Sequence, residues 1–270
     1  MTDSTTGTNH LAPIRHDAAV AFSGLRERLR RREPLAVAFL DLGSPVSAEL
    51  TAMSGFDVVV VDLEHGAGDE AAGRAQIQAA GRHAAVVVRV PDGPIQAGRM
   101  LDAGADGVIV PQIGSPEEAE RVARGVRYAG TRGISPFSRG NRYGAAGPDF
   151  RAQADERVAC IVQIERASAL EAVDAIAALD DVDALLMGPA DLSADLGWEL
   201  DLDGPQLREA AERVAAAAAR HGKAAALHMA RAEQAPGFRE LGFTMLSCTF
   251  ESAILAAGSA AAAANLRNLG

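Results

Sequence analysis

Four consecutive valines at positions 58–61 constrain the fold of this chain more than any other stretch. An uninterrupted apolar run of this length predicts a strand buried on both faces, as in parallel sheets covered by helices. The acid/base side chains of Asp62, Glu64 and His65 follow directly. Taken alone, the stretch favours a simpler interpretation, in which these polar residues only cap a turn. What weakens that interpretation is the recurrence of the pattern along the chain.

Apolar runs typical of strands alternate with longer helical runs throughout the sequence. Strands are expected over residues 35–41, 57–62, 85–90, 107–110, 158–164, 182–187, 224–228 and 243–248. Helices are expected over residues 20–32, 46–54, 69–83, 95–103, 116–128, 167–179, 205–221 and 250–266. Residues 130–150, rich in Gly, Pro and Arg, are expected to form a long loop. Eight strands alternating with helices predict a (β/α)8 barrel.

Length and composition are those of one domain. The chain has 270 residues, of which 48% are hydrophobic and 23% charged, and single α/β barrels commonly run to about 250 residues. We therefore expect one barrel domain over residues 19–270. Residues 1–18 contain no apolar segment of the signal-peptide kind and are expected to be a disordered lead-in.

Charge and cysteine content limit the partners and the compartment. A net charge of -10 argues against nucleic acid or an anionic membrane as a main partner, and no apolar span of about 20 residues is present. Cys160 and Cys248 lie in apolar runs, where buried reduced thiols are expected rather than a bridge. These features predict a cytoplasmic protein.

Lysine usage excludes one kind of chemistry. Lys223 is the only lysine of the chain and lies at the start of an expected strand, the end of a barrel away from its active site. Neither a Schiff base with substrate nor a pyridoxal cofactor is therefore expected. The sequence also lacks the glycine-rich phosphate motifs GxGxxG and GxxxxGK[ST], so nucleotide binding has no support.

Polar residues follow several of the expected strands at their carboxyl ends. They are Asp62, His65, Arg89, Gln163, Glu165 and Asp191. Each has a structural alternative, because Arg89 can belong to an ion pair and Glu165 or Asp191 can cap the following helix. Together they predict a metal-assisted site at the carboxyl-end mouth of the barrel, since converging buried charges are costly without a ligand. By strand alternation, Glu64 is expected to point away and to serve the scaffold.

Six segments of the chain resemble a known family. GFDVVVVDLEHG, VVVRVP, LDAGADGVIVP, RGISPFSRGNRYG, QIE and GPADLS, in this order over residues 34–258, resemble the HpcH/HpaI aldolase/citrate lyase family of class II pyruvate aldolases. The resemblance implies a (β/α)8 barrel that forms a trimer or a hexamer, with the last helix packing on a neighbouring subunit. It further implies a divalent cation, Mg²⁺, Mn²⁺ or Co²⁺, and reversible aldol chemistry on pyruvate.

The same resemblance assigns roles to individual residues. It places the metal on Glu165 and Asp191. It assigns substrate contacts to Gln163, to the backbone at Ala190 and to Asp191. His65 matches the catalytic base, Arg89 the transition-state stabiliser, and Asp102 the carboxylate that raises the basicity of the histidine. Asp62 is expected near the water molecules of the metal.

The residue types suit one reaction, and alternatives stay open beside it. A neutral imidazole can take the proton of the C4 hydroxyl of a 4-hydroxy-2-oxo acid, and a metal chelate with Arg89 can stabilise the enolate that remains. The expected activity is therefore carbon–carbon lyase cleavage to pyruvate and an aldehyde. The alternatives are a related lyase or synthase that uses a CoA thioester or oxaloacetate, and a catalytically silent scaffold.

Three positions depart from the pattern of the family. Phe39 stands where many relatives carry tryptophan, His228 ends the seventh expected strand, and the eighth strand ends in the unusual sequence SCTFES. For His228 a core or supporting role is expected rather than metal binding. The departures leave the shape of the aldehyde pocket open.

Overall fold

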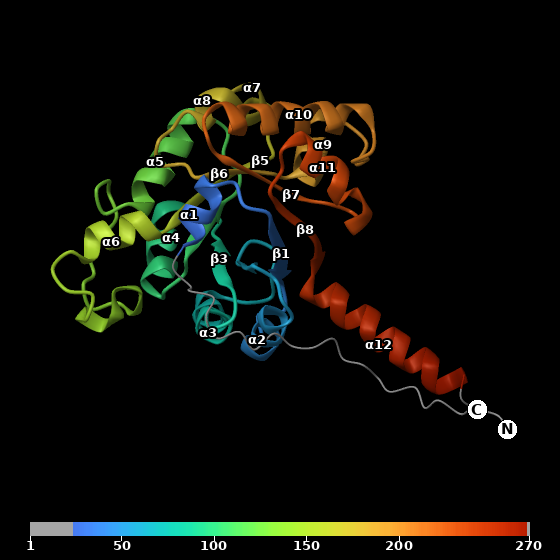
Figure 1. The fold of residues 1–270 in the computed structure, drawn as a ribbon, viewed down its shortest axis with the longest axis horizontal. Coiled ribbons are helices and arrows are strands. Elements are labelled where there is room, and N and C mark those ends of the chain that lie inside the picture. The colour runs from blue at the N-terminus through green and yellow to red at the C-terminus, as the bar shows by residue number, and fades with distance from the viewer. Residues whose placement is uncertain (1–23, 269–270) are drawn as a thin grey trace.

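Eight parallel strands form a closed barrel in sequence order, β1 to β8 (Figure 1). The structure is a computed structural model that describes residues 24–268. It confirms the prediction of a (β/α)8 barrel, with a helix at each end of the described chain. The expected disordered lead-in, residues 1–18, and the beginning of the first expected helix lie outside the described residues.

The strands agree closely with the apolar runs of the sequence. They are β1 Leu35–Leu40, β2 Val58–Asp62, β3 Ala85–Arg89, β4 Gly107–Val110, β5 Ala159–Ile164, β6 Ala184–Met187, β7 Ala224–His228 and β8 Met245–Phe250. Each predicted strand end lies within two residues of the observed one. The agreement follows from burial, because strands inside a ring of helices have to be apolar on both faces.

The helices are α1 Leu25–Arg30, α2 Pro45–Met53, α3 Glu70–Ala80, α4 Gly93–Asp102, α5 Pro116–Val126, α6 Phe150–Arg157, α7 Ala167–Glu171, α8 Val173–Ala177, α9 Pro189–Leu196, α10 Pro205–Arg220, α11 Ala235–Leu241 and α12 Glu251–Asn268, with 3-10 turns η1 Arg139–Gly144 and η2 Ala232–Gln234. The sequence did not predict α6, α9 or α11. The single helix expected over residues 167–179 is wrong, because Ala172, with ψ 12°, separates α7 from α8.

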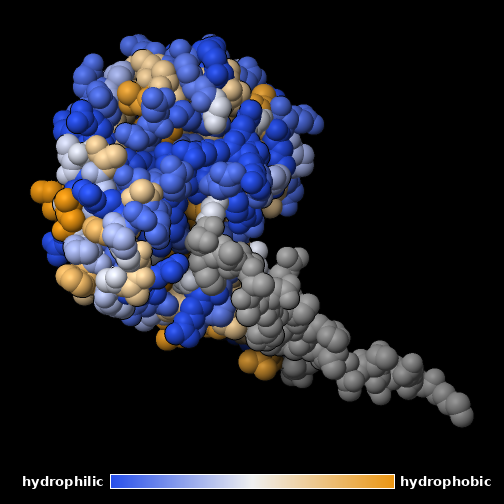
Figure 2. All heavy atoms as spheres, turned by 60° about the vertical axis from the view of Figure 1, so that its left-hand side comes forward, coloured by the Kyte–Doolittle hydropathy of each residue, from blue (hydrophilic) through white to orange (hydrophobic). Residues whose placement is uncertain are grey.

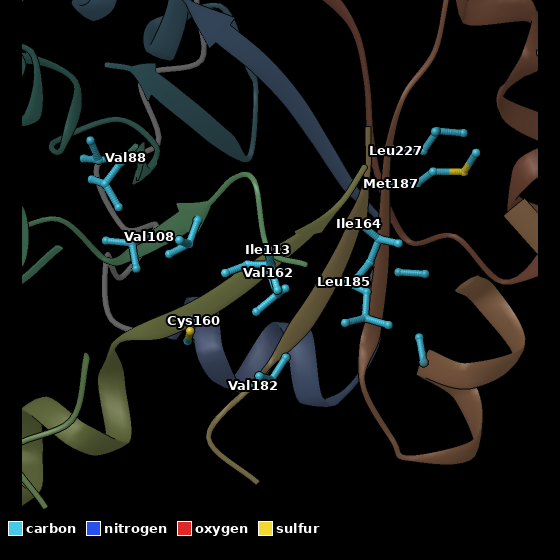
Figure 3. Close-up of a cluster of buried hydrophobic side chains, with 14 of the residues drawn as sticks. Val88, Val108, Ile113, Cys160, Val162, Ile164, Val182, Leu185, Met187 and Leu227 are labelled. Atoms are coloured by element: carbon cyan, nitrogen blue, oxygen red, sulfur yellow. The ribbon is translucent and has the colours of Figure 1, made fainter. Parts of the chain in front are cut away.

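Strand alternation divides the core into an inner and an outer cluster. In β2, Val58 and Val60 belong to the inner cluster, whereas Val59 and Val61 pack outward against the helices. Figure 3 shows part of the outer cluster, in which Cys160 lies among the apolar side chains that surround Val162. Four consecutive valines are therefore explained by a strand that meets apolar surroundings on both sides.

The centre of the barrel is filled with side chains. The cavity left between Val37, Ile109, Ile161 and their neighbours has a volume of about 10 Å³, which is at most the space of one water molecule. No substrate fits at this depth, so chemistry has to take place above the packed layer, at the mouth.

The amino-terminal end of the barrel is closed by α1 and a buried charge cluster. Leu25 and Leu29 of α1 extend the inner apolar cluster. Asp183, directly before β6, accepts hydrogen bonds from Arg26 Nε at 2.7 Å and from Arg127 Nη2 at 2.6 Å. Its second oxygen also accepts the amide of Cys160 at 2.9 Å. Three donors thus satisfy one buried carboxylate, as burial of a charge requires.

The last helix, α12, extends away from the barrel (Figure 1). Within the described chain, Glu251 at its start is its one buried residue, and that carboxylate accepts the hydroxyl of Ser47 at 2.6 Å. Ile254, Leu255 and Leu266 are exposed to 45%, 60% and 73%. Among residues 24–268, these apolar side chains of α12 have little apolar cover.

The face seen in Figure 2 is mostly hydrophilic, with apolar residues in small separate patches. Among residues 24–268, no helix has both the length and the apolar character needed to cross a membrane.

Candidate active site

The inward-facing residues at the carboxyl ends of the strands form the mouth of the barrel. Alternation continues from the inner apolar cluster to the polar positions, so that Val60 precedes Asp62, Val87 precedes Arg89, and Ile161 precedes Gln163. Asp62 and Arg89 lie side by side in the pairing of β2 with β3. The structure thus brings the predicted polar ends of these strands onto one surface.

Arg89 is held in place by Asp62. The Arg89 guanidinium donates to both carboxylate oxygens, Nε to Oδ1 at 2.9 Å and Nη2 to Oδ2 at 2.5 Å. Burial alone would raise the pKa of Asp62, but the hydrogen bonds and charge of Arg89, with the amides of Glu64 and His65, hold it below its ordinary value. Asp62 is therefore a fixed anion that orients Arg89.

Glu64 belongs to this site, and the prediction that it points away is wrong. Its Oε2 lies 3.2 Å from Arg89 Nη1, and its side chain is 10% exposed. Alternation fails here because the strand ends at Asp62. The chain then turns, since Asp62 Oδ1 accepts the amides of Glu64 and His65 at 3.0 Å and 3.2 Å. Strand alternation therefore does not predict side-chain direction beyond Asp62.

His65 and Asp102 are not brought together within one chain. The His65 side chain is 63% exposed at the rim of the mouth, with Nε2 3.8 Å from Glu64 Oε2. Asp102 is the last residue of α4, the helix that leads into the amino-terminal end of β4. There it accepts a hydrogen bond from Arg132 Nη2 at 2.7 Å. His65 follows the carboxyl end of β2, so the two residues lie at opposite ends of the barrel.

Glu165 is a buried carboxylate with two hydrogen-bond donors. The backbone amide of Gln112 donates to Oε1 at 2.6 Å, and the Gln163 side-chain amide donates to Oε2. Burial raises the pKa of Glu165 to about 7, and the charges of Glu64 and Asp191 act in the same direction. The amide of Gln112 opposes this shift without cancelling it. Burial and two neighbouring carboxylates thus favour the protonated form of Glu165 when no cation is bound.

Two residues that the sequence did not single out shape the Glu165 site. Gln112 has a left-handed backbone, φ 61°, which is unusual for a residue with a side chain. Its amide donates to Glu165, and its side chain accepts from Arg166 at 2.6 Å. At Gly188 an added Cβ would lie 2.9 Å from Gln163 Nε2 and 2.9 Å from Glu165 Oε2. Gly188 could have been identified from its place in the GPADLS motif, whereas nothing in the sequence indicates the left-handed backbone of Gln112.

Asp191 and Ala190 lie in the first turn of α9. Both are exposed, and Pro189 begins the helix, so its first turn opens toward the mouth that follows β6. The charge of Asp191 contributes to the raised pKa of Glu165, so the two carboxylates lie within electrostatic range of each other. Backbone amides in a first helical turn also suit a substrate carboxylate.

Lys223 is remote from this mouth. It directly precedes β7, and its Nζ donates to the carbonyl of Leu179 at 2.9 Å. Its position at the amino-terminal end of the barrel agrees with the prediction.

The residues at the mouth fit a divalent cation. Glu165 and Asp191 are hard oxygen donors, and the pKa of Glu165 is raised first by burial and then by the nearby charges of Glu64 and Asp191, an environment that a bound cation would favour. Within residues 24–268, Gln163 Oε1 is buried and lacks a hydrogen-bond partner. No group of three or more His, Cys, Asp or Glu side chains in that part of the chain is arranged to hold a metal ion. Two carboxylates would thus leave coordination positions for water or substrate oxygens.

The fold is a (β/α)8 barrel, and its carboxyl-end mouth carries an oriented arginine and several carboxylates. Enzymes with this fold place their active sites at the same end. The family model of the HpcH/HpaI aldolase/citrate lyase family matches residues 35–257. The chain belongs to this family, as the sequence motifs predicted, and its class is that of the carbon–carbon lyases.

Curated relatives and solved structures match over most of their length. A 5-keto-4-deoxy-D-glucarate aldolase of Klebsiella pneumoniae is 36% identical over 76% of this chain and 82% of that protein. A 4-hydroxy-2-oxo-heptane-1,7-dioate aldolase of the same organism is 34% identical over 90% of this chain and 93% of that protein. A crystal structure of an HpcH/HpaI aldolase/citrate lyase family protein from Burkholderia cenocepacia has a TM-score of 0.84 at 33% identity, covering 91% of this chain and 99% of that one.

Proposed function

We propose that the protein is a metal-dependent aldolase that cleaves a 4-hydroxy-2-oxo acid reversibly to pyruvate and an aldehyde. The observation that carries this proposal is the buried Glu165, whose pKa is raised by burial and further by the charges of Glu64 and Asp191, in the same mouth as an arginine oriented by two carboxylates. The two Klebsiella pneumoniae relatives are both named aldolases, which supports the same reaction type.

Glu165 and Asp191 would hold the cation, of the Mg²⁺, Mn²⁺ or Co²⁺ kind. A divalent ion bound there supplies Lewis-acid stabilisation of an enolate oxygen. The chain provides the remaining parts. Arg89, fixed by Asp62 and Glu64, holds its positive charge where the enolate oxygen develops. Gln163, which donates to Glu165, and the first-turn amides of α9 at Ala190 would orient the 2-oxo acid.

His65 acts as the base in this proposal. Its exposed imidazole takes the proton of the C4 hydroxyl, the bond between C3 and C4 breaks, and the aldehyde carbonyl forms. The electron pair remains on the pyruvate fragment as an enolate. Protonation at C3 then gives pyruvate and completes the reaction.

The role of Asp102 depends on assembly. Within one chain it lies at the opposite end of the barrel from His65, so it would have to support the histidine of another subunit. We propose a trimer or hexamer in which α12 packs on a neighbour, because its exposed Ile254 and Leu255 have no apolar cover within residues 24–268. We further propose that this assembly works in the cytoplasm.

The decisive test is a panel of 4-hydroxy-2-oxo acids, with pyruvate release followed by a coupled lactate dehydrogenase assay before and after chelation. We expect chelation to abolish activity and the cation to restore it. Glu165→Ala should remain inactive at any metal concentration, whereas the exposed Glu120→Ala serves as the matched control. Activity that survives thorough chelation, or persists in Glu165→Ala, would contradict the metal mechanism. Activity that requires a CoA thioester would point to a related lyase or synthase.

His65→Ala separates the base from the metal ligands. We expect turnover to fall while the affinity for the cation stays near that of the unmodified protein. Loss of metal binding in this variant would make His65 a ligand instead.

A further inference from the structure

The side of the mouth formed by β7, β8 and β1 is aromatic. His228 ends β7 and, by alternation with Ala224 and Ala226 of the inner cluster, its side chain faces inward. Its ring lies edge-on to Phe39, with centroids 5.6 Å apart, and tilted against Phe250 at 4.8 Å. The guanidinium carbon of Arg89 lies 5.4 Å from the Phe39 ring centroid. This aromatic wall, Phe39, His228 and Phe250, therefore borders the proposed reacting centre.

We assign to His228 the tautomer in which Nδ1 donates to Ser247. Nδ1 lies 3.2 Å from Ser247 Oγ, and the Ser247 hydroxyl can donate onward to the carbonyl of Thr249 at 3.5 Å. With its proton directed to Thr249, Ser247 Oγ accepts from the imidazole, so Nδ1 carries the hydrogen. Nε2 is then an acceptor, and it has no hydrogen-bond partner among residues 24–268.

The imidazole is also uncharged over the working pH range. Burial lowers the pKa of His228 to about 4, and the positive charge of Arg89 acts in the same direction. The Arg89 guanidinium is itself paired with Asp62 and Glu64. This side of the mouth thus presents apolar ring faces and the lone pair of His228 Nε2. The aromatic wall carries no free positive charge that could bind a carboxylate.

The two sides of the mouth suit different halves of the substrate. Glu165 and Gln163 end β5, and Asp191 follows β6, which puts the proposed pyruvate half on that side. Arg89 of β3 contacts the aromatic wall at Phe39 of β1, two strands away in the barrel. The aldehyde half lies on the other side of the breaking bond, and in this arrangement it contacts the wall formed by β7, β8 and β1.

We propose that His228 is a specificity-determining residue that selects aldehydes bearing a neutral hydroxyl group. Its Nε2 accepts the hydroxyl proton of the aldehyde fragment, while Phe39 and Phe250 pack against the carbon chain. An apolar aldehyde leaves this acceptor unpaired, and a carboxylate meets a lone pair instead of a donor. This inference deepens the proposed function and rests on it.

The test uses the aldol direction, with pyruvate and two aldehydes of equal size. Glycolaldehyde and propanal differ by a hydroxyl in place of a methyl group, and succinate semialdehyde adds the carboxylate case. The measured quantity is the ratio of kcat/KM for glycolaldehyde to that for propanal. Intrinsic differences in aldehyde reactivity cancel when this ratio is compared between the unmodified protein and a variant.

We expect His228→Leu to lower the ratio by about tenfold, the effect of one hydrogen bond of ordinary net strength. His228→Gln, which offers an amide in place of Nε2, should retain most of the preference. His83→Leu is the matched control, because His83 lies outside the mouth, between α3 and β3, and should leave the ratio unchanged. Because His228→Leu removes the lone pair that faces a carboxylate, its use of succinate semialdehyde should not fall relative to propanal; a fall would show that His228 attracts the carboxylate and would contradict the proposal.

Metal-dependent exchange of the C3 protons of pyruvate in D2O separates this inference from the proposed function. Exchange requires the metal side of the mouth but no aldehyde. Absence of exchange in the unmodified protein would contradict the proposed function itself. If exchange persists in His228→Leu and the ratio stays within about twofold of the unmodified value, the inference about His228 is wrong. A leucine variant that does not fold is replaced by His228→Ala, to which the same criterion applies.

Discussion

Gly188→Ala tests whether the position of Glu165 is set by the space that the glycine leaves. Gly188 has φ -101° and ψ 87°, which alanine can adopt, so the backbone itself does not resist the change. The added Cβ would lie 2.9 Å from Glu165 Cβ and Oε2, whereas ordinary contacts begin at 3.4 Å. Glu165 must therefore move by about 0.5 Å or more, or Gly188 must move away from it.

The expected loss follows from that displacement. Glu165 is held between the amide of Gln112 at 2.6 Å and the side chain of Gln163, so it cannot move without lengthening one of these hydrogen bonds. A misplaced ligand or supporting contact typically lowers metal affinity by about 10- to 100-fold, and a shift of about 1 Å in an active site can cost about 100-fold in rate. We expect the affinity of Gly188→Ala for the cation to fall within that range.

The assay is isothermal titration of the metal-free protein with Mn²⁺, together with kcat/KM at saturating metal. Gly98→Ala is the matched control, because Gly98 lies within α4 and an added Cβ there meets no atom within 4 Å. That change should leave metal binding intact and stabilise the helix by about 0.5–1 kcal/mol. Unchanged metal affinity and turnover in Gly188→Ala would refute the claim that this glycine sets the position of Glu165.

Three further predictions concern other parts of the molecule. Asp183→Ala removes the carboxylate that the buried guanidinium groups of Arg26 and Arg127 share, and it should lower the free energy of unfolding by about 3–5 kcal/mol in urea titrations, whereas Asp174→Ala, at an exposed ion pair, should change it little. Metal affinity should rise with pH up to about 7 and then stay constant, because Glu165 must lose its proton to bind the cation. Without metal, the contribution of Glu165 to the free energy of unfolding falls as pH rises from 4.5 to about 7, since the folded state holds that proton more tightly than the unfolded state. Calorimetry in buffers of different ionisation enthalpy measures the released proton, and its absence would contradict the assignment. Leu255→Asp should reduce the oligomer mass measured by light scattering, while the circular dichroism spectrum of the barrel stays unchanged. An unchanged mass would show that α12 is not part of the interface.

The barrel was predictable because its strands record their surroundings in the sequence. The valines of β2 have apolar neighbours on both faces, and no exposed strand could carry them. Helices with clear start signals were equally visible, as at α5, where Ser115 accepts the amide of Glu118 and Pro116 begins the helix. Apolar runs and helix-capping residues determine these elements locally, so they could be predicted from short stretches of sequence.

The features that the sequence did not reveal depend on contacts between distant segments. Glu64 turns toward Arg89 because Asp62 captures two amides after the strand has ended, a geometry that residue spacing does not encode. The separation of Asp102 from His65 follows from which end of the barrel each segment reaches. The left-handed backbone of Gln112 likewise leaves no trace in residue type, because such a position ordinarily selects glycine or asparagine.

The lone lysine at the closed end of the barrel has a practical consequence for handling this protein. Burial lowers the pKa of Lys223, so a larger share of its amine is free to react with acylating reagents at a given pH. It is also the one lysine side chain that such reagents can modify. Immobilisation through Lys223 would attach the protein to a surface by the end opposite the mouth, with the site facing the solution.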